Sequence, residues 1–192
     1  MANAVCVGSE ELAESYRTTS TTEKWRLPCH QSDLPLLSTS DEQVGREFAA
    51  AHQYVSIGTH YEDQTFPRLA QFFYEQAEEE RGHAMKMVKY LLDTNCKVEL
   101  GTIDAPANHF ESPIDPIKLA VEQESKVTVH ISELFGIARE TKDYQSEQFI
   151  EWFLEEQVEE EATMQDLLDV AERTREIPML LEEYIAREHN GG

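Results

Sequence analysis

Residues 78–83 read Glu78-Glu79-Glu80-Arg81-Gly82-His83 and lie in the middle of a long helical pattern. Glu80 and His83 are three positions apart, so a helix projects both side chains from one face, close enough to hold one metal ion. Both also fall on the apolar stripe of that helix, which continues in steps of three and four through Phe73, Gln76, Glu80, His83, Met87 and Tyr90. A carboxylate and an imidazole in a helix core must be paired, hydrogen-bonded or coordinated to a metal. Their partners have to come from elsewhere in the chain.

The composition indicates one globular domain. A chain of 192 residues can form a complete hydrophobic core with at most a tail beside it. Hydrophobic residues make up 40% of it, which is too many for a disordered chain. No apolar run approaches the roughly 18 residues of a membrane span. The first ten residues lack the basic start and apolar run of a secretory signal, so we expect a cytoplasmic protein without membrane contact.

Charge and cysteine content exclude further classes. The formal net charge is −22, from 38 acidic and 16 basic residues, and nucleic-acid binding would need a surplus of Lys and Arg. Such a charge either keeps the protein in solution or concentrates cations around it. The three cysteines, Cys6, Cys29 and Cys96, are widely spaced and include no Cys-x-x-Cys pair. That spacing argues against a disulfide framework or a thiolate zinc site and suits a reducing compartment.

The chain divides into an N-terminal extension and a helical domain. Residues 1–37 show no sustained periodicity and are interpreted as a flexible extension. Residues 38–192 are expected to form one domain with helices at about 40–61, 66–94, 115–140, 143–173 and 177–189. The first of these helices is expected to begin at a capping box, Ser40-Asp41-Glu42-Gln43. No strand alternation appears anywhere in the chain.

A long connection separates the second and third helices. Residues 95–113 contain one glycine and two prolines and show no strong periodicity, which is unusual inside a compact domain. A segment of this length makes sense if the chain must travel the full length of a helix bundle before the next helix begins. The predicted fold is therefore all-α: a four-helix bundle of two hairpins joined by a long crossover, with a short fifth helix at the C-terminal end.

Each of the four long helices carries a glutamate in its apolar stripe: Glu47, Glu80, Glu124 and Glu160. Four carboxylates in one core cannot all stay ionised without compensation, because like charges repel strongly at low dielectric. Two divalent cations would neutralise them, with His83 and Gln157 completing the ligand shell. Oxygen ligands with a single nitrogen suit iron or manganese better than a structural zinc site. Two such ions, bridged by Glu80 and Glu124, could together reduce dioxygen.

Tyr54 lies two helical turns from Glu47 on the same stripe. Two roles are open for it. It is either a packed core tyrosine whose hydroxyl is hydrogen-bonded, or an electron donor beside the metal ions.

These residues, in this order on four helices, resemble the non-haem bacterial ferritins, and most closely their actinobacterial type. The resemblance covers about residues 41–188 and rests on Glu47…Tyr54, Glu80-Arg81-Gly82-His83, Gln123-Glu124 and the run from Trp152 to Glu160. It implies a ferritin-like bundle with a ferroxidase centre, in which Glu47, Glu80 and His83 hold one iron with Gln157 close by. Glu80, Glu124 and Glu160 would hold the second iron. It also implies a third iron site at Glu79, Glu156, Glu159 and Glu160.

The sequence departs from the related bacterioferritins at two places. Those proteins carry a second Glu-x-x-His on the fourth helix, where this chain reads Gln157-Val158-Glu159-Glu160. They also bind haem through a methionine that follows the ligand glutamate of the second helix, where this chain has Arg81. No haem is therefore expected.

The resemblance implies iron storage with ferroxidase activity. Fe²⁺ and either O₂ or H₂O₂ would be the substrates, and ferric mineral would collect inside a hollow homo-oligomer of about 24 subunits. One alternative is a di-iron peroxidase or oxidase of the rubrerythrin class that acts on peroxide without storage, although the chain has no four-cysteine module. The other is a non-catalytic assembly subunit that docks through residues 1–37.

Overall fold

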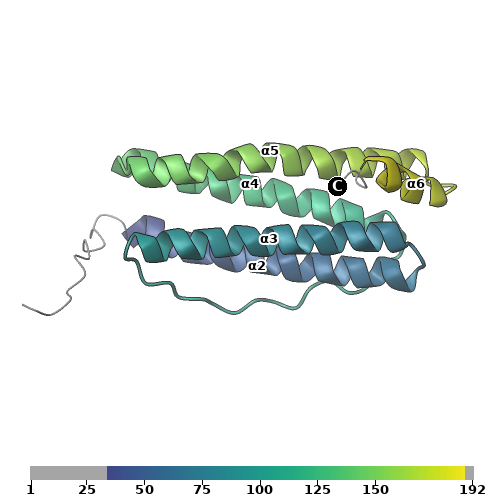
Figure 1. The fold of residues 1–192 in the computed structure, drawn as a ribbon, viewed down its shortest axis with the longest axis horizontal. Coiled ribbons are helices and arrows are strands. Elements are labelled where there is room, and N and C mark those ends of the chain that lie inside the picture. Colours follow the sequence, from purple (N-terminus) through teal and green to yellow (C-terminus); the bar gives the residue numbers. More distant parts are fainter. Residues whose placement is uncertain (1–33, 189–192) are drawn as a thin grey trace, which may run out of the picture.

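The computed structural model describes residues 34–188, which form five helices and no strand. These are α2 (Leu34–Asp63), α3 (Pro67–Asp93), α4 (Asp115–Thr141), α5 (Tyr144–Arg173) and α6 (Met179–Glu188). The all-α bundle predicted from the sequence is confirmed (Figure 1). No helix in this part of the chain is long and apolar enough to cross a membrane. The extension predicted for residues 1–37 lies outside the described residues as far as residue 33.

The bundle consists of two antiparallel hairpins (Figure 1). A short turn joins α2 to α3, and Pro67 opens α3, where its missing N–H costs no hydrogen bond. Another short turn joins α4 to α5. The long crossover runs beside α2 along the whole bundle, and α6 lies at the end of the bundle where α5 ends (Figure 1). The predicted crossover between the second and third helices therefore has the expected path.

The start of α2 is the main difference from the predicted helix bounds. The helix begins at Leu34, not near Ser40, so the predicted boundary of the extension at residue 37 falls inside it. Pro35 lies in its first turn, where proline is tolerated, and the residues interpreted as a capping box lie within the helix. The other helices begin and end within two residues of the predicted positions.

Gln53 on α2 fastens the crossover to the bundle. Its side-chain amide donates to the carbonyl of Ala107 at 3.0 Å and accepts from the N–H of the same residue at 2.8 Å. The neighbouring Ser56 hydroxyl also donates to the Ala107 carbonyl, at 2.8 Å. Nearer the start of α4, the Tyr61 hydroxyl donates to the carbonyl of Pro113 at 2.6 Å. A segment without its own secondary structure thus satisfies part of its backbone through side chains of α2.

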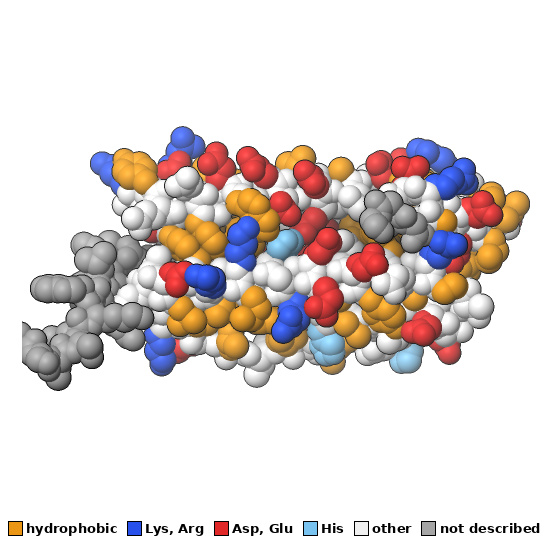
Figure 2. Space-filling model, in the orientation of Figure 1, with side chains coloured by type: hydrophobic (Ala, Val, Ile, Leu, Met, Phe, Trp, Pro, Cys, Tyr) orange, Lys and Arg blue, Asp and Glu red, His pale blue; other side chains and the backbone are white. Residues whose placement is uncertain are grey.

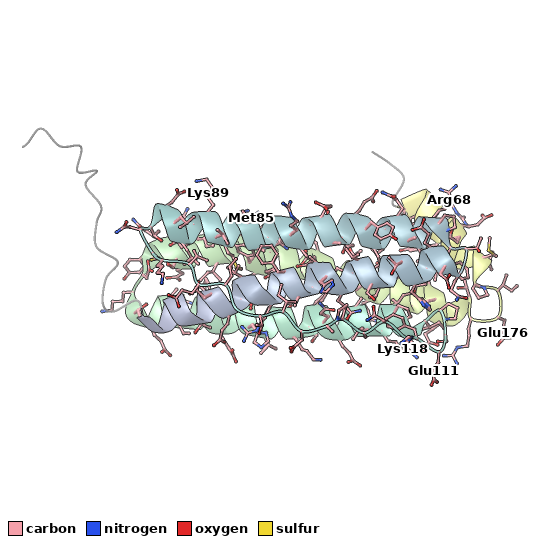
Figure 3. The ribbon with its side chains drawn as sticks, turned by 90° about the horizontal axis from the view of Figure 1, so that it is seen from below. Arg68, Met85, Lys89, Glu111, Lys118 and Glu176 are labelled. Carbon is pink, nitrogen blue, oxygen red and sulfur yellow. The ribbon has the colours of Figure 1, made fainter. Side chains whose placement is uncertain are left out.

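The buried carboxylate of Glu182 docks α6 onto the bundle. It accepts hydrogen bonds from the backbone N–H groups of Arg68 and Leu69, at 3.1 and 2.9 Å, in the first turn of α3. The N-cap residue of α3, Phe66, provides no side-chain cap, so Glu182 supplies the acceptor that this helix end needs. Figure 3 shows Arg68 at this end of α3, beside α6.

Two apolar clusters fill the two ends of the bundle. One contains buried residues of α2 from Tyr54 onward, together with aromatic and aliphatic residues of α3, the start of α4, the end of α5 and α6. The other is formed by Val44, the second half of α3, the second half of α4 and the first half of α5. Between these segments, every long helix turns at least one ionisable or polar side chain inward: Glu47, Glu80, His83, Glu124, Gln157 and Glu160. The core is therefore apolar at both ends and carries ionisable groups in the middle.

Candidate metal centre

The four long helices bring their buried carboxylates together in two groups. Glu47, Glu80 and His83 form one group, and Glu80, Glu124 and Glu160 form the other. Within each group the nearest ligand atoms all lie within 4.8 Å of one another, a separation that one metal ion can bridge. Glu80 is common to both groups, whereas Glu124 belongs to one only.

The imidazole of His83 connects α3 to α5. Its Nδ1 lies 3.7 Å from Oε2 of Glu80 and 3.5 Å from Oε1 of Glu160. Two aromatic rings of α5 pack edge-on against it, with centroid distances of 5.6 Å to Trp152 and 5.9 Å to Phe153. The imidazole is therefore held in place by apolar rings on one side and faces carboxylates on the other.

Hydrogen bonds from neighbouring helices orient Glu124. The hydroxyl of Tyr54 on α2 donates to its Oε1, and the amide nitrogen of Gln157 on α5 lies 3.3 Å from its Oε2. The same amide nitrogen donates to the hydroxyl of Thr128 at 3.2 Å. The structure thus places Gln157 beside the second group as a hydrogen-bond donor to Glu124.

Gln43 orients Glu47 through a hydrogen bond, as Tyr54 and Gln157 orient Glu124. Its amide nitrogen donates to Oε1 of Glu47 at 2.8 Å, and its side chain is fully buried. Gln43 was expected only as part of a capping box, although it lies four residues before Glu47 and continues the same inward-facing stripe. The signal in the sequence was a second polar residue, Gln43, in the same helical register as Glu47.

Several carboxylate oxygens of the centre have no hydrogen-bond donor. Within the described residues, Oε2 of Glu47, Glu80 and Glu160 is buried without a hydrogen-bond partner, although Nδ1 of His83 lies 3.7 Å from that of Glu80. A buried ionised carboxylate accepts at both oxygens and needs a donor or a cation at each. The free oxygens come from three different helices and lie in the two groups described above. This donor set, rich in carboxylate with one imidazole, fits iron or manganese.

Burial and mutual repulsion raise the pKa values of these carboxyl groups. Burial, and next the charge of Glu80, raise the pKa of Glu47 well above its usual range, and burial followed by Glu124 does the same for Glu80. The pKa of Glu160 rises to about 8, from burial first and the charge of Glu124 second. Burial also raises the pKa of Glu124, while the hydrogen bond from Tyr54 opposes the rise. Without cations the centre therefore retains protons at neutral pH, and cations must displace them.

Three of the four carboxylates expected to form a third site lie outside these groups, whereas the fourth, Glu160, belongs to the second group. Glu79 and Glu159 are exposed and Glu156 is half-buried, and none of them joins a cluster of three close ligand atoms in residues 39–188. The amide of Gln76 donates to Glu79. Arg81 is also exposed, with its guanidinium 3.9 Å from a carboxylate oxygen of Glu78.

Comparisons with known proteins agree with this architecture. The sequence matches the ferritin-like domain family over residues 41–174. It is 44% identical over 147 residues to ferritin BfrB of Mycobacterium tuberculosis, a match that covers 77% of this chain and 81% of the relative. The identity to a bacterial non-heme ferritin of Staphylococcus epidermidis is 38% over 138 residues, covering 72% and 83%.

A solved structure shows the same fold. The open-pore ferritin of the archaeon Archaeoglobus fulgidus superimposes with a TM-score of 0.77 at 25% sequence identity. The superposition covers 80% of this chain and 96% of the archaeal chain.

Proposed function

The chain belongs to the ferritin family, and from that premise we propose that it stores iron and oxidises Fe²⁺ to Fe³⁺ as the iron enters. The observation that carries the proposal is the pair of ligand groups that meet at Glu80 in the middle of the bundle. Their separation and shared carboxylate suit two iron ions held side by side. In this proposal Glu47, Glu80 and His83 bind one ion, and Glu80, Glu124 and Glu160 bind the other.

In the proposed reaction, two Fe²⁺ ions supply the two electrons that the oxidant takes up. Each Fe²⁺ gives up one electron, and O₂ takes up both electrons with two protons to leave as H₂O₂. With H₂O₂ as oxidant, two electrons and two protons give two molecules of water. Protons released from Glu47, Glu80 and Glu160 when the ions bind are available at the place of reaction, since burial raises the pKa of each of these carboxyls. Because the ligand side chains are buried or half-buried, little water can surround the reacting ions.

Storage requires a hollow shell, which we propose to be a homo-oligomer of about 24 subunits in the cytoplasm. The named ferritin relatives and the docked fifth helix support this proposal. The formal net charge of −22 per chain would attract Fe²⁺ to the shell and favour growth of mineral inside it. Oxidised iron would leave the two groups for that mineral and free them for further Fe²⁺.

A di-iron peroxidase without storage would use the same two groups. The two functions differ in what happens to the iron after oxidation, so the particle itself discriminates between them. Light scattering and native mass spectrometry of the purified protein should give a particle of roughly half a megadalton, since each chain has a mass of 22.0 kDa. Aerobic addition of Fe²⁺ should then load far more iron than the binding groups hold. A small oligomer that keeps about two irons per chain would contradict storage and favour the peroxidase.

A further inference from the structure

A series of aromatic rings runs from His83 towards the surface between α3 and α5. The ring of Phe153 lies 5.9 Å from the imidazole of His83 and 5.3 Å from the ring of Phe149, measured between centroids. Phe149 in turn stacks on Tyr90 of α3, with the two rings nearly parallel and their centroids 3.9 Å apart. Tyr90 is seven residues after His83 and lies on the same face of α3. Rings in contact thus connect a proposed iron ligand to a tyrosine.

The Tyr90 end of this series can be reached from solvent. Tyr90 and Phe149 are half-buried, whereas Phe153 is buried. Figure 2 shows hydrophobic side chains gathered between α3 and α5, beside a histidine and a basic side chain. A group that becomes oxidised at this end can therefore be reduced again by a small molecule in solution.

The hydroxyl of Tyr90 has a route for its proton. Its oxygen lies 2.8 Å from Oγ of Ser146, in the first turn of α5. Ser146 donates its own hydroxyl hydrogen to Oδ2 of Asp143, the N-cap residue of α5, so the hydrogen between Tyr90 and Ser146 belongs to the phenol. A phenol gives up its proton when it loses an electron, and the serine can pass that proton to the carboxylate. Tyr90 therefore combines a ring contact towards the centre with a proton acceptor.

Trp152 lies closer to the centre but is a less favourable place to remove an electron. Its ring packs edge-on against both His83 and Phe153. The ammonium group of Lys86 on α3 lies over the face of the same ring. A cation at this face stabilises the neutral indole and opposes its oxidation, since the indole radical that forms first is itself a cation. Electron loss is therefore directed away from Trp152 and towards Tyr90.

We propose that Tyr90 is a reserve electron donor, which supplies one electron when H₂O₂ meets a centre that holds a single Fe²⁺. Reduction of H₂O₂ to two molecules of water takes two electrons and two protons. Fe²⁺ supplies one electron and becomes Fe³⁺, and Tyr90 supplies the other through the aromatic rings and becomes a neutral tyrosyl radical. The phenol proton passes through Ser146 to Asp143, and the two protons that form water come from solvent.

The second electron decides which product leaves the centre. Without it, a single Fe²⁺ would split H₂O₂ into hydroxide and a hydroxyl radical, which attacks the protein around it. With it, both oxygen atoms leave as water, and the unpaired electron remains on a tyrosine that solvent can reach. The proposal rests on the proposed function for the reaction of Fe²⁺, whereas the electron path through the rings can be tested without iron.

Electron paramagnetic resonance detects the radical. Less than one Fe²⁺ per chain and an excess of H₂O₂ are added to the full-length protein, which is then frozen. The parent should give a tyrosyl signal that narrows when the protein contains ring-deuterated tyrosine. Tyr90→Phe should lose this signal and release several-fold more hydroxyl radical to a spin trap. Tyr144→Phe is the control and should match the parent, because Tyr144 is an exposed tyrosine of α5 without a ring contact among the described residues.

Two further variants separate the ring contacts from the proton acceptor. Ser146→Ala leaves the stack of Tyr90 on Phe149 but removes the proton route, so the tyrosyl signal should become weaker. Lys86→Met removes the cation from the indole face, so part of the radical should remain on Trp152. Ring-deuterated tyrosine does not narrow the signal of a tryptophan radical, and this difference identifies the shift.

Pulse radiolysis tests the electron path in the metal-free protein. Azide radicals oxidise tryptophan, and a Trp25→Phe background leaves Trp152 as the single tryptophan. The Trp152 radical should convert into a tyrosyl radical at a rate that does not depend on protein concentration. Tyr90→Phe should remove most of this conversion, and Tyr144→Phe should leave it unchanged.

Three results would overturn the proposal. The first is a tyrosyl signal of parent size in Tyr90→Phe, which would place the radical on another tyrosine. The second is the absence of this signal in a parent protein that does oxidise Fe²⁺ with H₂O₂. The third is a Trp152 radical that does not convert into a Tyr90 radical in the metal-free protein. Failure of the proposed function would look different, because Fe²⁺ would stay unoxidised while radiolysis still showed the transfer from Trp152 to Tyr90.

Discussion

The hydroxyl of Tyr54 on α2 donates a hydrogen bond to Oε1 of Glu124 on α4, across the core of the bundle. Tyr54 is fully buried, and burial, followed by the charge of Glu124, raises the pKa of its phenol well above the usual range. The phenol therefore stays protonated and remains a donor. Its hydrogen bond acts on Glu124 in the opposite sense, because it favours the ionised carboxylate that a metal ion requires.

Replacing Tyr54 with phenylalanine should weaken Zn²⁺ binding by roughly tenfold and slow Fe²⁺ oxidation by a similar factor. Glu124 would lose a donor and hold its proton more tightly. Tyr61→Phe is the matched control, since this second buried tyrosine of α2 donates to the carbonyl of Pro113 away from the centre. Calorimetry with Zn²⁺ separates the two roles of Tyr54. Unchanged Zn²⁺ affinity with slowed Fe²⁺ oxidation would identify an electron donor.

Glu80→Ala should slow Fe²⁺ oxidation by more than about 100-fold, because the variant loses the one carboxylate that both ligand groups share. His83→Ala should also oxidise Fe²⁺ slowly, since this substitution removes the one imidazole in the two ligand groups. Glu78→Ala is the control: this exposed glutamate of the same acidic run is paired with Arg81. Stopped-flow absorbance measures the rates, and light scattering verifies assembly. An assembled Glu80→Ala particle that oxidises Fe²⁺ at the parent rate would refute the assignment.

The metal-free protein should lose stability as the pH rises from about 5 to about 8. The Glu160 carboxyl has a pKa of about 8 in the folded chain against an ordinary value of 4.5, so the folded state binds its proton more tightly than the unfolded state does. This stabilisation is complete below the ordinary pKa and disappears as the pH rises through 8. The loss of unfolding free energy for this one group amounts to at most about 5 kcal/mol.

Thermal unfolding in the presence of a chelator, at several pH values, tests this dependence. Glu160→Gln should make the dependence of stability on pH less steep, because the substituted amide does not titrate while Glu47, Glu80 and Glu124 still do. Saturation with Zn²⁺ should abolish or reverse it, since the ions replace the protons. A metal-free protein whose stability stays level or increases across this window would contradict the expected pKa of Glu160.

Two helical glycines should respond to alanine with opposite signs. A Cβ atom at Gly58 would lie 2.5 Å from Cε1 of Tyr74 on α3. Gly58→Ala therefore forces the Tyr74 ring to move and should lower the free energy of unfolding by about 1–2 kcal/mol. A Cβ atom at Gly82 has no neighbour within 4 Å, so Gly82→Ala should raise the free energy of unfolding by about 1 kcal/mol through helix propensity alone. Chemical denaturation of both variants measures the two changes. A loss of stability in Gly82→Ala would show that its open side is occupied in the assembled particle.

Periodicity was sufficient to predict which side chains face the core. Glu47, Glu80, Glu124 and Glu160 each lie in register with large apolar residues of their own helix, and a long helix leaves little freedom in which face is buried. Glu160 is the least buried of the four, and the pattern placed it as readily as the others. The crossover could be predicted because its length matches the distance that it must travel.

Contacts between helices could not be predicted in the same way. The pairing of Lys86 with Trp152 depends on how α3 and α5 are rotated against each other, and Glu182 reaches the start of α3 only after α6 has docked. The sequence around Gln53 does not indicate Ala107 as its partner, because α2 and the crossover meet only in the folded bundle. The start of α2 was misplaced because Pro35 breaks helices in general but is accepted in a first turn.

The two ligand groups differ in how much of the chain each requires. All three residues of the first group belong to α2 and α3, whereas the second also needs Glu124 and Glu160 from α4 and α5. An ion in the first group would therefore join α2 to α3 within one hairpin. The second group appears only when the hairpins meet, and the binding energy of an ion there is also energy of bundle closure. Removal of the ions is therefore expected to weaken the contact between the two hairpins more than the contacts within either hairpin.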